Sequence, residues 1–234
     1  MKRFYKEVTA TPLEDGSGWC VRLDGRAIKT AGGRPQVVPS QALAEALAAE
    51  WAAQGEEIDT ARFVTRDLVD FALDAVAPQR ETALTELLPY AETDTLCYRA
   101  DPDEALYKRQ LEVWEPLLTA TEERLGLRFT RISGIMHRPH PEETLSRIAQ
   151  ELARHDAFTL AALKMMASLA ASLIIALAAL EDDADAAALW RAANLEEDWQ
   201  VELWGEDAEA AENRAARLAA FELAMRVAKL AKAH

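Results

Sequence analysis

The chain has 234 residues, of which 50% are hydrophobic, and a formal net charge of −14. This length allows one or two globular domains, and the hydrophobic content excludes intrinsic disorder. The negative charge argues against nucleic acid or an anionic membrane as the main partner and favours a basic protein surface. The two cysteines, Cys20 and Cys97, have no spacing typical of a metal or redox site. The N-terminus shows no signal or transit pattern, so we expect a cytoplasmic, bacterial protein.

The N-terminal part of the sequence has the pattern of a small β-sheet. Residues 19–23 alternate between apolar and polar side chains, Asp24-Gly25 suits a tight hairpin turn, and residues 26–30 form the returning strand. Further strands are expected at residues 4–11 and 36–38. A sheet of three or four strands needs a covering layer to be stable.

Two amphipathic helices are expected to supply that cover. Ser40 is a good N-cap, and apolar residues recur at helical spacing through residues 43–51. A second helix is expected around residues 65–75, with a break at Pro78. We therefore predict a β-containing N-terminal domain over residues 1–78.

The remainder of the chain, residues 79–234, is helical in pattern almost throughout. Its centre is residues 157–180, whose only charge is Lys164, and we expect one long helix that is buried on several sides. A membrane span is the competing interpretation, but no aromatic belt, following Lys/Arg cluster or second span accompanies the stretch. The predicted fold class is α+β, with a small N-terminal β-containing domain and a larger all-helical C-terminal domain, and no membrane insertion.

No motif for nucleotide, cofactor or metal binding is recognisable. The glycine pairs lack the spacing of a phosphate-binding loop. One loop gathers metal-ligating residue types, namely His137, His140, Glu142 and Glu143. Two prolines interrupt this group and no helix sets its spacing, so a solvated loop is favoured over a metal site.

Candidates for catalysis are equally weak. Three acids recur at helical spacing, at Asp67, Asp70 and Asp74. Such spacing usually marks a solvated helix face, and no serine or cysteine stands in a nucleophile context. We therefore expect a binding protein without a cofactor, and not an enzyme.

The strongest candidate for function is an acidic stretch near the C-terminus. Residues 181–212 hold twelve acids against one base, Arg191. One helical face is expected to pack on the core and consists of Leu195, Trp199 and Leu203. Another face consists of Glu197, Val201 and Trp204. Composition alone favours a solvated acidic helix whose tryptophans are core residues.

Several segments, in order over nearly the whole chain, together resemble one protein family. They are residues 19–30, 39–40, 43–54, 92–100, 114–118, 134–136 and the run Glu197-x-x-Gln200-x-x-x-Trp204-Gly205-Glu206. The family is the α-proteobacterial and mitochondrial assembly chaperone for the α subunit of F-type ATP synthase. Residues 63–68 depart from it, since the family usually has a proline in that run.

The resemblance implies a non-enzymatic chaperone that binds the unassembled α subunit and shields its interface until the β subunit arrives. It implies no nucleotide or metal, and the same two-part fold; we further expect a monomer. The client-binding candidates carried over by position are Glu196, Glu197, Gln200, Trp204, Gly205 and Glu206. Two alternatives remain open: a small-molecule enzyme with a site between the two domains, and a helical scaffold that dimerises through residues 157–180.

Overall fold

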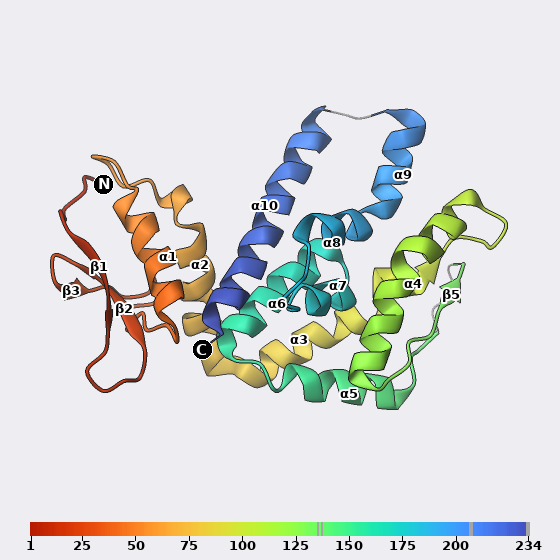
Figure 1. Cartoon of the computed structure of the whole chain (residues 1–234), viewed down its shortest axis with the longest axis horizontal. Coiled ribbons are helices and arrows are strands. Elements are labelled where there is room, and N and C mark those ends of the chain that lie inside the picture. Colours follow the sequence, from red (N-terminus) through yellow and green to blue (C-terminus); the bar gives the residue numbers. More distant parts are fainter. Residues whose placement is uncertain (135, 137, 206–207, 233–234) are drawn as a thin grey trace. The chain divides into compact units, whose positions relative to one another are not determined.

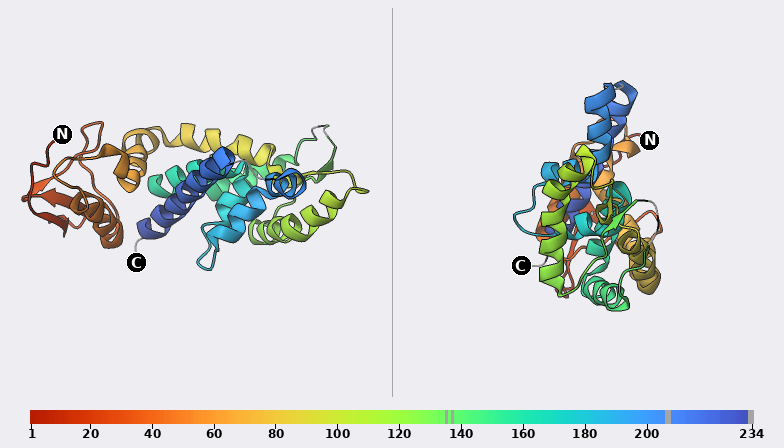
Figure 2. Two further views of the ribbon diagram at one scale, coloured as in Figure 1. Left: turned by 90° about the horizontal axis from the view of Figure 1, so that it is seen from above. Right: turned by 90° about the vertical axis from the view of Figure 1, so that its right-hand side faces the viewer.

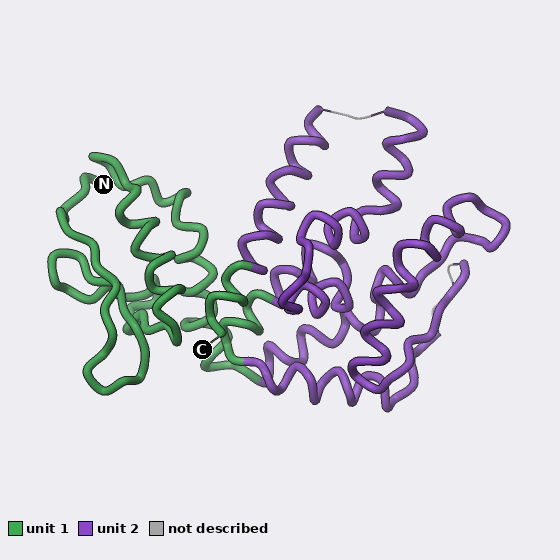
Figure 3. The backbone as a smooth tube through the Cα atoms, in the orientation of Figure 1, with its two compact units in different colours: residues 1–80, 156–162, 226–234 green, residues 81–155, 163–225 purple. Residues whose placement is uncertain are grey.

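The computed structural model describes residues 1–134, 136, 138–205 and 208–232. The chain forms two compact units, which Figure 3 colours separately. Unit 1 contains residues 1–80, 156–162 and 226 onward, and unit 2 contains residues 81–155 and 163–225. The predicted α+β class is confirmed. The division into a domain of residues 1–78 and a domain of residues 79–234 stays a prediction.

Unit 1 contains the three-stranded antiparallel sheet, in the order β1 (Val8–Pro12), β2 (Trp19–Leu23), β3 (Arg26–Ala27). Asp24 and Gly25 both have positive φ, 46° and 79°, which is the conformation that a two-residue hairpin of this kind requires. The expected fourth strand is reduced to an isolated bridge, in which Val38 and Trp19 exchange backbone hydrogen bonds of 2.8 and 2.9 Å. The hairpin is thus confirmed, and the sheet has three of the three or four strands that we expected.

Helix α1 (Gln41–Ala52) packs against β1 and β2, as Figure 1 shows. Ser40 caps it by accepting a hydrogen bond from the Leu43 amide at 3.1 Å. Leu43, Leu47 and Trp51 are buried along one side of α1. Next come the 3-10 turn Thr60–Arg62 and α2 (Val64–Phe71), which continues into a π-helical segment, Ala72–Val76, and a second 3-10 turn, Ala77–Gln79. Both expected helices are present; α1 packs on the sheet, and α2 packs on α1.

Two of the three acids that we expected on a solvated face instead anchor the chain after β3. Asp70 is buried and accepts hydrogen bonds from the Ala31 amide at 2.9 Å and from Gln36 Nε2 at 2.5 Å. Asp74 accepts from Thr30 Oγ1 and from the Gly32 amide, both at 2.8 Å. The expectation was wrong for these two because the backbone and side-chain donors of the loop need acceptors.

Unit 2 is mostly helical. Its helices include α3 (Arg80–Glu92), α4 (Ala105–Leu125), α5 (Glu142–Leu152), α6 (Ala157–Ala170), α7 (Leu173–Ala178), α8 (Ala186–Ala193), α9 (Leu195–Trp204) and α10 (Ala208–Ala231). The boundary between the units falls within α6 and α10, and Arg80 belongs to unit 1. After the 3-10 turn Thr95–Cys97, β4 (Tyr98–Arg99) pairs in parallel with β5 (Ile132–Ser133). Helix α4 continues through Pro116.

The apolar stretch at residues 157–180 is not the single long helix that we expected. Ala171 has a φ of +48°, which ends α6, and Ser172 caps α7. The buried carboxylate of Asp94 accepts from the Ile174 amide at 2.9 Å, in the first turn of α7. A carboxylate from a distant segment thus satisfies a free helix N–H group and stabilises the break. In the described part of the chain, no helix is both long and apolar enough to cross a membrane.

Candidate functional site

Helices α8 and α9 meet at Asn194, which lies between the end of α8 and the start of α9. The Asn194 side chain donates a hydrogen bond from Nδ2 to the carbonyl of Trp190 at 2.8 Å. Leu195, the first residue of α9, is buried as expected. The acidic residues 195–204 therefore form a short helix of their own, separate from α8.

Two buried side chains of α4 connect α4 to α8 and α9. Trp114 donates from Nε1 to the carbonyl of Ala192 at 2.7 Å. Gln110 donates from Nε2 to Glu196 Oε1 at 2.8 Å, while its own Oε1 accepts from the Ala100 amide. Glu196 therefore positions α9, which is a structural role for one of the six candidates.

An exposed pair of charges makes a second connection between α4 and α9. Arg109 binds Glu202 through both terminal nitrogens and lies over the Trp199 ring, 5.7 Å from its centroid. The Glu202 carboxylate raises the pKa of Arg109, and Arg109 lowers the pKa of Glu202. Asp198 forms an ion pair with Arg214 of α10. One side of α9 is thus occupied by contacts within unit 2.

The other side of α9 faces outward. Glu197, Gln200 and Trp204 follow at i, i+3 and i+7, and all three are exposed. The Trp204 side chain is 77% exposed and Leu203 is 56% exposed, so our placement of Leu203 in the core was wrong. Leu203 lies in the last turn of α9, next to the outward Trp204 and two residues before Gly205, and this position was the signal for exposure that we missed.

We call Glu197, Gln200, Leu203 and Trp204 the α9 patch. Within the described residues, the Glu197 and Gln200 side chains make no hydrogen bond or ion pair. In Figure 1 and in the right-hand view of Figure 2, α9 and the start of α10 extend away from the other helices of unit 2. Gly205 ends α9 with a φ of +90°, and Glu206 lies outside the described residues. An aromatic anchor beside a free carboxylate suits protein recognition.

The other groups that chemistry could use have structural roles. His140 is buried, contrary to the solvated loop that we expected, and its Nδ1 accepts from the Thr130 amide at 3.0 Å while Nε2 donates to the Ala91 carbonyl at 3.1 Å. His137 lies outside the described residues. Cys20 and Cys97 are buried thiols, and burial raises the pKa of Cys97. Among the residues that the structure describes, no group of three metal-ligating side chains occurs.

Residues 2–122 match the family model described as ATP12 chaperone protein. The chain is 28% identical over 226 residues to "Protein atp12, mitochondrial" of Schizosaccharomyces pombe, which covers 91% of this chain and 77% of that protein. The structure of Atp12 from Paracoccus denitrificans is similar with a TM-score of 0.93 and 35% identity, covering 99% of this chain and 98% of that one. A protein of Agrobacterium tumefaciens gives the same TM-score with 39% identity, covering 99% of this chain and 86% of that one.

The similarities to these individual proteins extend over nearly the whole chain, which agrees with the order of the resembling segments in the sequence. They confirm the family resemblance from which we expected an assembly role. The chain belongs to the ATP12 chaperone family of ATP synthase assembly factors.

Proposed function

We propose that this chain binds the unassembled α subunit of the F-type ATP synthase and covers its subunit interface until the β subunit arrives. Membership of the ATP12 chaperone family supports an assembly role. The observation that supports binding of a protein client is the α9 patch, where Trp204 and Leu203 are exposed beside Glu197. Two large apolar side chains that are exposed next to each other suit a surface that a partner covers.

The chemistry of the α9 patch suits a temporary cover. A subunit without its partner exposes an apolar interface and aggregates unless that interface is shielded. Trp204 can supply buried contact area, while Glu197 can orient a basic or amide-rich surface and speed the encounter. Such a contact can be displaced by the true partner, so release requires no chemical step by the chaperone.

The test is aggregation of the separate ATP synthase subunits, followed by light scattering. The chain should keep isolated α subunit soluble, leave isolated β subunit unaffected and hydrolyse no ATP. Protection of β, or equal protection of unrelated unfolded proteins, would show a general holdase and end the proposal.

Three variants test whether capture of the α subunit depends on the α9 patch or only on the negative charge of the chain. Trp204→Ala should weaken capture of the α subunit about tenfold or more, because buried tryptophans dominate interface energies. Glu197→Lys should weaken capture and reduce its salt dependence. Asp183→Lys, an equal charge change at an exposed position outside the patch, should alter affinity less than about twofold. Circular dichroism checks that each variant is folded.

We also propose that the protein acts as a monomer in the bacterial cytoplasm. Unit 2 joins its helices through internal contacts such as Trp114 to Ala192 and Arg109 to Glu202, which need no second copy. Sedimentation equilibrium should give the mass of one chain, and cell fractionation should recover it with the soluble proteins. A stable dimer would revive the helical scaffold alternative.

A further inference from the structure

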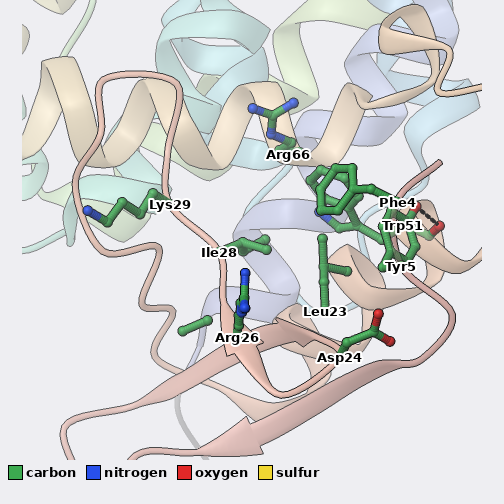
Figure 4. A pocket seen from close by; sticks show the side chains of 10 residues that line it. Phe4, Tyr5, Leu23, Asp24, Arg26, Ile28, Lys29, Trp51 and Arg66 are labelled. Atoms are coloured by element: carbon green, nitrogen blue, oxygen red, sulfur yellow. Dashed lines mark hydrogen bonds between the residues drawn. The ribbon is translucent and has the colours of Figure 1, made fainter. Parts of the chain in front are cut away.

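A pocket in unit 1 lies outside the α9 patch. It has a volume of about 540 Å³, which falls within the range of ligand-binding pockets. Figure 4 shows side chains from the N-terminal segment, the β2–β3 hairpin, α1 and α2 around it. The apolar part of the lining includes Phe4, Leu23 and Ile28. Phe4 is 64% exposed, so its ring is available to a partner.

The pocket is cationic, although the chain as a whole is strongly acidic. Arg26, Lys29 and Arg66 line it, with Asp24 as the single acid. The Asp24 carboxylate accepts hydrogen bonds from the backbone amides of Lys6 and Glu7, at 3.0 and 2.8 Å. A lining with three cations and one acid on a chain of net charge −14 is the charge distribution expected of a site for an anionic group.

The three cations are not equally available. Arg66 is mostly buried, its Nε is 3.4 Å from Asp70 Oδ2, and its guanidinium lies over the Phe63 ring at 5.0 Å. Arg26 and Lys29 are exposed and make no ion pair within 4 Å among the described residues. A ligand carboxylate can therefore approach Arg26 or Lys29 without breaking an existing ion pair.

Trp51 lines the pocket and supplies a signal by which ligand binding can be measured. Trp51 is 8% exposed, and its Nε1–H has no hydrogen-bond partner in the described part of the chain. Figure 4 shows its ring on the same side of the pocket as Tyr5, whose hydroxyl donates to the Trp51 carbonyl at 2.7 Å. The indole nitrogen is closed to water, so we assign it no ligand contact. Its NMR resonance will still respond to a ligand in the pocket.

We propose that this pocket binds an extended segment of the client protein in which an acidic side chain stands next to a bulky apolar one. The apolar side chain packs on Phe4, Leu23 and Ile28, and the carboxylate pairs with Arg26 or Lys29. That the client is the α subunit rests on the function proposed above. The α9 patch and this pocket carry opposite charges, so the two surfaces select different segments of a client.

The test uses the full-length, ¹⁵N-labelled chain, whose six tryptophans give six indole N–H resonances. Trp51→Phe assigns the Trp51 resonance by its disappearance. The probe is the blocked tetrapeptide acetyl-Ala-Glu-Leu-Ala-amide, with the Gln-for-Glu peptide and sodium acetate as comparisons. The Glu peptide should shift the Trp51 resonance in a saturable way, at least fivefold more tightly than the Gln peptide or acetate. Equal affinity for the Gln peptide would overturn the carboxylate contact, and equal affinity for acetate would overturn the apolar one.

Charge reversals locate the binding site. Arg26→Glu and Lys29→Glu should each weaken binding of the Glu peptide about tenfold. Arg62→Glu, the same change at an exposed position of unit 1 outside the pocket, should alter it less than twofold. Equal losses in all three variants would show a long-range charge effect and overturn the assignment to the pocket.

Capture of intact α subunit separates this proposal from the proposed function. If the wild-type chain captures the α subunit but neither peptide shifts the Trp51 resonance at millimolar concentration, the pocket proposal is wrong and the function stands. If the Glu peptide binds as expected but the α subunit is not captured, the pocket is supported and the identity of the client is wrong.

Discussion

Arg109 on α4 binds Glu202 on α9 in a bidentate pair, with Nη1 to Oε2 at 2.6 Å and Nη2 to Oε1 at 2.8 Å. Two parallel hydrogen bonds fix the relative direction of the side chains as well as their distance. Because both side chains are exposed, the pair is expected to add little to global stability. Its effect is local, since it orients the helix that carries the α9 patch.

Arg109→Lys keeps the charge but removes the bidentate geometry. We expect faster hydrogen exchange of the α9 amides, measured by mass spectrometry, with the melting temperature nearly unchanged. Arg147→Lys, in the exposed pair that Arg147 makes with Glu143 on α5, is the matched control and should leave α9 exchange unaltered. Unchanged α9 protection in Arg109→Lys would show that the other contacts of α9, which Gln110 makes with Glu196 and Arg214 with Asp198, hold the helix without this pair.

The same pair has a defined pH dependence. Arg109 lowers the pKa of Glu202 below its usual range, so the paired carboxylate stabilises the contact above that range. The contribution is lost only as pH falls through the lowered pKa. The Glu202 carboxyl resonance in NMR should therefore titrate at lower pH in wild type than in Arg109→Gln, and coincident titrations would contradict the contact.

Trp51 and Trp204 give a matched comparison of one substitution in two environments. Trp51 packs against Tyr5 and Phe63, with ring centroids 5.6 and 4.5 Å away, whereas Trp204 is exposed. Trp51→Ala should lower the free energy of unfolding by about 3–5 kcal/mol in urea denaturation, because it leaves a cavity. Trp204→Ala should change it by less than about 0.5 kcal/mol. A small loss at Trp51 would show that α1 does not form the cover of the sheet.

Asp94 should make stability depend on pH in the opposite direction to Glu202. Burial raises the pKa of Asp94 to about 7, although the amides of Leu96 and Ile174 donate to the carboxylate. The folded state then binds more protons than the unfolded state between pH about 4 and 7, so stability falls as pH rises through that window. Urea denaturation at several pH values measures this slope.

The variant Asp94→Asn tests whether Asp94 causes this dependence of the free energy of unfolding on pH. It should cost about 1–3 kcal/mol, because an amide cannot accept from both backbone groups as a carboxylate does. It should also flatten the dependence on pH between about 4 and 7. A variant with the same slope as wild type would assign the pH dependence to other groups.

The proposal that residues 1–78 form a domain can be tested as a fragment. Unit 1 also includes residues 156–162 and the end of α10, and the Ser40 hydroxyl donates to the Leu230 carbonyl. We predict that the isolated 1–78 fragment unfolds at a lower urea concentration than unit 1 in the full chain, followed by the fluorescence of Trp51. Equal midpoints would show that these distant segments add nothing to its stability.

The sequence by itself determined the elements whose cause is local. Asp24-Gly25 has the conformational freedom that its hairpin turn needs, and Ser40 caps the helix that directly follows it. The helical pattern expected toward the C-terminus is present as α10, at Ala208–Ala231. These outcomes depend on the dihedral preferences and spacing of near neighbours, which are visible in the chain itself. The family was visible in the same way, from the order of several short segments.

Only the tertiary structure decided which polar groups are partners and which are free. Asp94 stabilises the break before α7 from a position 80 residues away, so the apolar stretch alone looked like one helix. Gln110 binds Glu196 and Arg109 binds Glu202, whereas no described side chain binds Glu197. In the sequence these three acids look alike. A helical period shows which residues share a face, but not which partner that face meets. Buried donors and carboxylates find their partners across the fold, where the cost of leaving them unpaired decides the arrangement.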